Sequence, residues 1–169
     1  MKTKPNPFIS SLHTPTCGPF RVLTPVLAMV VALTSAAHAV DGTWAVDALG
    51  NWNDATKWSS NPVVPGGAGS TVGLTFDITG ARTVTIDTTS ATVGTLNIGD
   101  PAASPSVYTL GANGGASLIL DNSGTGAQIN HLSTGAADTI TAPVSLLDNL
   151  AISNAATTAF SISGAIAST

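Results

Sequence analysis

One pattern of hydrophobic and polar positions recurs between residues 84 and 163: an apolar residue, any residue, an aliphatic residue, then a small polar residue or glycine. Side chains two residues apart share one face of a β-strand, so each copy predicts a strand of three or four residues with one buried face. The intervals leave no room for a helix of ordinary length. The copies are residues 84–87, 96–99, 108–111, 118–121, 127–130, 138–141, 150–153 and 160–163.

The spacing of the copies fits two all-β architectures, an antiparallel sandwich and a parallel β-solenoid. We favour the solenoid, because an aliphatic residue occupies the third position every time, as expected when equivalent side chains stack inside one core. A sandwich would need more large aromatic residues than Phe76, Tyr108 and Phe160. The predicted core anchors lie 9 to 12 residues apart: Ile86, Ile98, Leu110, Leu120, Ile129, Ile140, Ile152 and Ile162.

This spacing suggests two strands per coil and about 22 residues per coil, within the range of stacked repeats, and hence about four coils. The segment 72–77 also alternates apolar and polar residues, and we predict it to be the first strand of the body.

The chain divides into three predicted segments. Residues 1–39 have the form of a signal peptide: Lys2, Lys4 and Arg21 precede an apolar run at 26–33, and small residues flank His38. The alternative is an uncleaved anchor. Residues 40–66 form a Trp-rich cap that ends in a loop rich in proline and glycine, and residues 67–169 form the coils. We expect the coil segment to be truncated at its C-terminus.

Cleavage before Val40 would leave nine aspartates against Lys57 and Arg82, a formal charge of −7. Nucleic-acid binding is disfavoured, because phosphate contacts need clustered basic residues. The single cysteine, Cys17, lies in the signal segment, so the exported form would contain no disulfide bond.

The three tryptophans, Trp44, Trp52 and Trp58, fall within fifteen residues. Their large apolar surface predicts a cluster that closes one end of the coil stack. The alternative is a platform of exposed rings on which sugars stack.

Several segments resemble the N-terminal part of the autotransporter-associated β-strand repeat proteins, a family of exported bacterial proteins. The similar segments are Trp44, Gly50-Asn51-Trp52, Trp58-Ser59, Pro65-Gly66-Gly67, and residues 74–77, 84–87 and 93–99. The resemblance implies a right-handed parallel β-helix that is secreted or displayed at the cell surface, in some members carried by a C-terminal β-barrel translocator. The glycine-rich repeat that gives the family its name is not present in this sequence.

Candidate chemistry in the coils is sparse. Asp87, Asp100 and Asp121 end predicted strands, and stacking could bring such carboxylates together on one ridge for glycoside hydrolysis. A polysaccharide lyase would need a basic residue as proton acceptor, and Lys57 and Arg82 are poorly placed for this role.

We predict that His131, with Ser133 nearby in the sequence, is a solvated turn residue, because no nucleophile motif accompanies it. The turn at 121–126 lacks the spacing of a calcium loop, and a zinc site lacks ligands.

We therefore predict a non-enzymatic, exported surface or matrix protein with no catalytic, cofactor-binding or metal-binding residues and no cofactor. It would act as a β-helical stalk or adhesin-like passenger segment, secreted or associated with the outer membrane. The alternative is a carbohydrate-active module of the same fold, which binds glycans through tryptophan or hydrolyses them through aspartate. The expected partners are cell-surface or extracellular glycans, with membrane contact only through a C-terminal translocator or anchor. The oligomeric state stays open.

Overall fold

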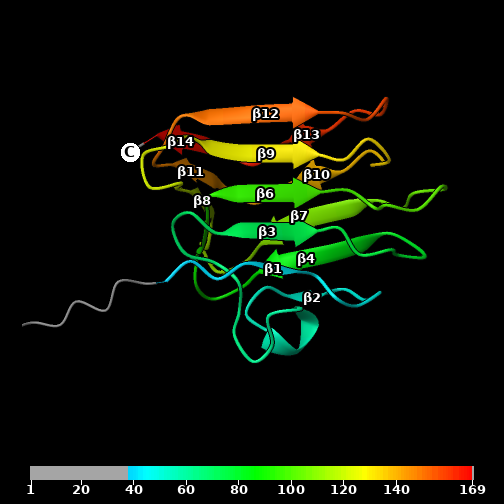
Figure 1. The fold of residues 1–169 in the computed structure, drawn as a ribbon, viewed down its shortest axis with the longest axis horizontal. Coiled ribbons are helices and arrows are strands. Elements are labelled where there is room, and N and C mark those ends of the chain that lie inside the picture. The colour runs from blue at the N-terminus through cyan, green and yellow to red at the C-terminus, as the bar shows by residue number, and fades with distance from the viewer. Residues whose placement is uncertain (1–37, 169) are drawn as a thin grey trace, which may run out of the picture. The chain divides into compact units, whose positions relative to one another are not determined.

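Three parallel β-sheets surround one hydrophobic core in the computed structural model, which describes residues 38–168 (Figure 1). Sheet 1 contains, in spatial order, β1 (Gly42–Thr43), β3 (Thr71–Leu74), β6 (Thr95–Ile98), β9 (Ala127–His131) and β12 (Leu150–Asn154). Sheet 2 contains β2 (Gly50–Asn51), β4 (Arg82–Ile86), β7 (Tyr108–Ala112), β10 (Thr139–Ile140) and β13 (Ser161–Ile162). Sheet 3 contains β5 (Ala91–Val93), β8 (Leu118–Leu120), β11 (Val144–Leu146) and β14 (Ile166–Ser168).

The chain visits the three sheets in turn, and each coil stacks on the coil before it. All pairings between these strands are parallel, as in β3 with β6 and β6 with β9. The only helix among the described residues is one 3₁₀ turn, η1 (Ala55–Lys57). The predicted all-β parallel β-helix is confirmed, and the sandwich alternative is wrong.

Each complete coil contains three strands, so the prediction of two strands per coil is wrong. The in-register positions Val72, Leu96, Ile129 and Ile152 are 24, 33 and 23 residues apart. The corners account for the variation: Gly94 alone separates β5 from β6, whereas residues 121–126 separate β8 from β9. Because β5 directly precedes β6, residues 91–98 contain two strands, whereas the sequence pattern marks only the second of them.

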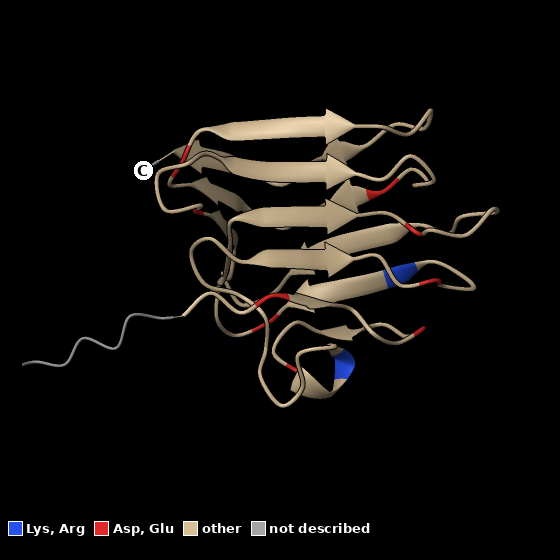
Figure 2. Ribbon diagram, viewed as in Figure 1, with Lys and Arg blue, Asp and Glu red and all other residues tan. Residues whose placement is uncertain are grey.

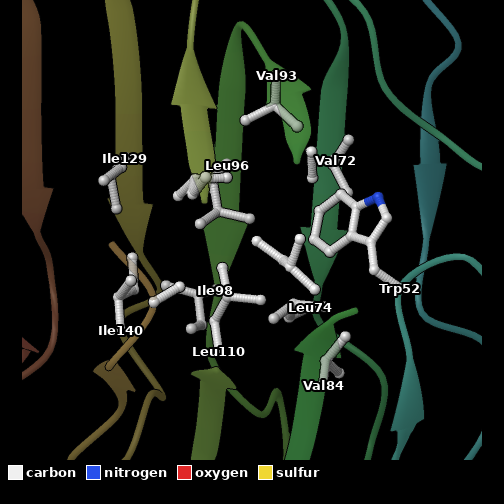
Figure 3. Close-up of a cluster of buried hydrophobic side chains, with 14 of the residues drawn as sticks. Trp52, Val72, Leu74, Val84, Val93, Leu96, Ile98, Leu110, Ile129 and Ile140 are labelled. Atoms are coloured by element: carbon white, nitrogen blue, oxygen red, sulfur yellow. The ribbon is translucent and has the colours of Figure 1, made fainter. Parts of the chain in front are cut away.

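Aliphatic side chains form columns inside the stack (Figure 3). One column runs through Val84, Leu110, Ile140 and Ile162, which pair in register across sheet 2. Removal of this apolar surface from water is the main stabilising term of such a core. Six of the eight predicted anchors are fully buried: Ile86, Ile98, Leu110, Leu120, Ile129 and Ile140.

The two other anchors, Ile152 and Ile162, lie in the last described coil, where Ile162 is only partly buried. Ile152 is 52% exposed, although its register partner Ile129 is completely buried. Ile166 in β14, which is not one of the predicted anchors, is likewise 54% exposed, whereas its partner Val144 is 1% exposed. The strands β12, β13 and β14 end their sheets, so each has one edge without a neighbouring strand among the described residues.

The Trp-rich segment closes the opposite end of the stack and also contributes to the sheets. β1 pairs with β3, and β2 pairs with β4, so residues 42–51 form an incomplete first coil. Trp52 lies beside Val72 and Leu74 at the end of the aliphatic columns (Figure 3). The predicted N-terminal Trp-rich cap is therefore present.

The predicted signal peptide, residues 1–39, lies outside the described residues except for its last two positions. Between residues 38 and 168, no helix is both long and apolar enough to cross a membrane.

Candidate functional site

The three tryptophan rings are packed against one another and are not accessible to a ligand. Trp44, Trp52 and Trp58 are each at most 2% exposed. Trp58 contacts Trp44 and Trp52 edge to face, with ring centroids 5.0 and 4.8 Å apart. Each indole N–H donates to a backbone carbonyl, those of Ala48, Pro65 and Trp52 respectively. These rings provide no surface on which a sugar can stack.

The aspartates considered for hydrolysis do not meet on one ridge. Asp87 follows β4 in sheet 2, Asp100 follows β6 in sheet 1, and Asp121 follows β8 in sheet 3. Stacking aligns residues within a sheet, so strands of three different sheets carry these carboxylates to different corners. Asp100 accepts the backbone N–H groups of Ala102 and Ser106 and thereby holds its own turn.

Other carboxylates join successive coils. Asp148 accepts the N–H groups of Asn122 and Gly124 from the coil below. Asp41 accepts the N–H of Thr71 at 2.7 Å. These bonds satisfy backbone donors at strand ends and in corners that would otherwise lack a partner. Asp41, Asp100 and Asp148 therefore have structural tasks, and residues 38–168 contain no group of three or more His, Cys, Asp or Glu side chains placed to hold a metal ion.

The two strong bases lie near the N-terminal end of the stack, and Arg82 is paired. Its guanidinium lies 2.7 Å from Asp47, whose carboxylate also accepts the hydroxyl of Thr79. That hydroxyl bond, with Arg82 nearby, lowers the pKa of Asp47. Lys57 ends η1 in the cap. Lys57 and Arg82 are the only Lys and Arg between residues 38 and 168 and lie on different elements, η1 and β4, so this part of the chain has no cluster of basic residues (Figure 2).

His131 is buried in the core, contrary to the prediction that it is a solvated turn residue. It is 2% exposed, and it extends the inward-facing column of Leu74 and Ile98 by one coil. The strand β9 continues one residue beyond the sequence pattern, which is why this side chain points inward. Gly135 makes room for the ring, since a Cβ at that position would collide with it.

Both ring nitrogens of His131 face oxygen acceptors. Nε2 lies 2.8 Å from Asp138 Oδ2, and Nδ1 lies 2.7 Å from Asn154 Oδ1. The Asn154 amide is fixed in this orientation, because its Oδ1 accepts the N–H of Ala156 and its Nδ2 donates to Thr158 O. Nδ1 therefore donates to Asn154 Oδ1, and Nε2 and Asp138 Oδ2 form a buried hydrogen bond. Since both nitrogens are occupied, the ring cannot serve Ser133 as a base.

Tyr108 completes this buried polar group. Its N–H donates to Asp138 Oδ1 at 2.6 Å, and its hydroxyl donates to the carbonyl of Phe76 at 2.9 Å. Burial raises the pKa of the Tyr108 hydroxyl, and the carboxylates of Asp100 and Asp138 raise it further.

The raised pKa of Tyr108 predicts loss of stability at alkaline pH. An unfolded tyrosine ionises near pH 10, so above about pH 10 ionisation favours the unfolded chain, whereas below it the contribution of the neutral phenol is fully present. Because Tyr108 is the only tyrosine in the chain, phenolate absorbance reports on it alone. We expect this absorbance to appear only together with loss of the β-sheet circular dichroism signal. Ionisation near pH 10 in a chain that stays folded would contradict the prediction.

An open groove of about 690 Å³ lies on the outer face of sheet 1, where β1, β3 and β6 meet the cap. Gly73 forms its floor, and a Cβ there would lie 2.9 Å from the side chain of Thr43. The groove exists because this outward position has no side chain. It is lined by Asp41, Gly42, Thr43, Ser59, Thr71, Gly73, Thr75, Asn97, Pro101 and Leu132.

Sequence reasoning missed this groove and the His131–Asp138 pair. The lining residues come from five separate stretches of the chain, and no motif links them. Thr71, Gly73 and Thr75 alternate along β3 and face outward, and this is the one local signal that could have indicated an exposed polar strip.

Comparison with known proteins gives no relative: no protein-family model, no curated protein and no solved structure matches this chain.

Proposed function

We propose that this chain is a non-enzymatic, exported surface or matrix protein whose coils form a rigid, stalk-like or adhesin-like segment. The observation that supports the proposal is the stack of in-register aliphatic columns, closed by tryptophan at one end and open at the other. In such an array each coil contacts only its neighbours, so stability accumulates coil by coil. Each added coil lengthens the stack by about 4.8 Å, the distance between paired strands.

The outer surface also suits this role. The strands of sheet 1 contain no Asp, Glu, Lys or Arg, and the acidic residues lie mainly at strand ends and corners (Figure 2). The charge-free edges of the last coil would accept further parallel strands. Two features that could have supported a carbohydrate-active function are weakened. The tryptophan rings are buried, and the candidate carboxylates of Asp87, Asp100 and Asp121 follow strands of three different sheets.

Expression of residues 1–169 in a Gram-negative bacterium tests the proposal. We expect the recovered protein to begin at Val40 and to be found outside the cytoplasm, without turnover of polysaccharides. A cytoplasmic product that retains Met1 would contradict export. Polysaccharide turnover that is lost in Asp87→Asn or Asp121→Asn would contradict the non-enzymatic role.

A further inference from the structure

We propose that the groove on the outer face of sheet 1 binds a short stretch of a neutral glycan. This inference goes beyond the stalk role and does not depend on export, because binding is measured on the purified protein. The volume of about 690 Å³ falls within the range of about 300–1,000 Å³ usual for small-molecule sites.

The groove has unused hydrogen-bonding capacity of both kinds. Asn97 Oδ1 accepts the amide of Asn130 at 3.0 Å, and its Nδ2 has no partner among the described residues, so it is a donor. Asp41 uses Oδ1 for the N–H of Thr71, which leaves Oδ2 as an acceptor. Ser59 Oγ accepts both the N–H and the hydroxyl of Thr43, so its own proton can be donated.

Such a set of hydroxyl, amide and carboxylate groups matches the neighbouring hydroxyls of a sugar ring, each of which both donates and accepts. The hydroxyls of Thr71 and Thr75 have no hydrogen-bond partner within residues 38–168 and add to this set. Pro101 and Leu132 contribute apolar surface, against which the C–H face of a sugar can pack. The groove thus offers polar contacts for orientation and apolar contacts for burial.

The charges in the groove narrow the class of ligand. Asp41 is the only charged residue of the lining, and no Lys or Arg lies in it. A phosphate, a sulfated glycan or a polyuronate would meet a carboxylate without a compensating cation. A neutral glycan carries no such penalty.

The position of the groove argues against an extended peptide. Peptides that add to a sheet pair their backbone with an exposed edge. Here the floor is the face of β3, whose two edges are already paired with β1 and β6. A ligand in the groove can therefore contact only side chains and the surface of Gly73, and it cannot pair with the backbone of β3. Recognition by polar side chains suits a hydroxyl-rich molecule.

The test is titration of the purified, ¹⁵N-labelled protein with soluble neutral hexasaccharides of glucose, mannose and N-acetylglucosamine, in α- and β-linked forms. Polygalacturonate and a lysine-rich peptide serve as an anionic and a cationic comparator. We expect at least one neutral hexasaccharide to shift the backbone amides of Gly73 and Asn97. The proposal is overturned if none of them binds, if shifts cluster elsewhere, or if either comparator binds the groove more tightly.

A matched pair of variants assigns the binding to the groove. Asn97→Asp keeps the oxygen that accepts from Asn130 but replaces the free donor with a second negative charge, so we expect at least tenfold weaker binding. Gln128→Glu makes the same chemical change on β9, on the same sheet face but outside the lining, and should leave binding unchanged. Both variants should melt at the wild-type temperature. Equal affinity of wild type and Asn97→Asp would refute the assignment.

Discussion

Replacement of Ile98 with aspartate should prevent the protein from folding. Ile98 is completely buried in β6, with Leu74 on one side of its column and His131 on the other. An unpaired carboxylate in this position costs at least several kcal/mol, which is comparable to the whole stability of a typical domain, about 5–15 kcal/mol. His131 cannot compensate the new charge, because both of its nitrogens are already engaged.

The matched control is Thr95→Asp on the same strand. Thr95 alternates with the buried Leu96 and points away from the core, so the added charge stays in contact with water. Circular dichroism and thermal melting of the two variants make the comparison. A near wild-type spectrum and melting temperature for Ile98→Asp would mean that this side chain does not face a packed interior.

Removal of the carboxylate of Asp138 should destabilise the folded protein by about 2–6 kcal/mol, because it leaves two buried hydrogen-bonding groups without a partner, at a cost of about 1–3 kcal/mol each. In Asp138→Ala the Nε2 of His131 loses its hydrogen-bond partner, and the N–H of Tyr108 loses its acceptor. Both groups are buried, so water cannot replace the missing oxygens without opening the core.

Asp138→Asn provides the control. The amide oxygen can still accept the N–H of Tyr108, and the amide NH₂ can donate to a neutral His131 that keeps its Nδ1 proton for Asn154. We therefore expect a clearly smaller loss than in the alanine variant. Urea unfolding measures both, provided the slope of the transition stays constant. Equal midpoints for Asp138→Ala and the wild type would show that the pair adds nothing to stability.

These two predictions rest on a core whose aliphatic anchors the sequence indicates, whereas the stacking of those anchors and the polar residues among them are not indicated by the sequence. The period-two alternation is a local property, so the strands around Ile98, Leu110 and Leu120 could be predicted without any knowledge of the fold. Which anchors stack on each other depends on corner length, and the corners vary from one residue to several. For this reason the number of strands per coil was predicted wrongly.

The buried polar residues likewise could not be predicted from local sequence, because register between coils decides their positions. His131 carries no local mark of burial, because the residues around it are typical of a turn. Its position depends on the pairing of β9 with β6 and β12, and its two partners come from the next corner and the next coil. The groove likewise joins the cap, three strands of sheet 1 and two corners, and it opens where stacking places Gly73 between bulkier outward residues.

The sequence by itself determined the all-β class, the short strands, the aliphatic anchors and the tryptophan cap, since each follows from the properties of neighbouring residues. The tertiary structure alone decided the three-stranded coil, the burial of His131 and the tryptophan rings, the separation of Asp87, Asp100 and Asp121, and the position of the groove. The physical reason is that register between coils brings together residues more than twenty positions apart, and the lengths and conformations of the corners set that register.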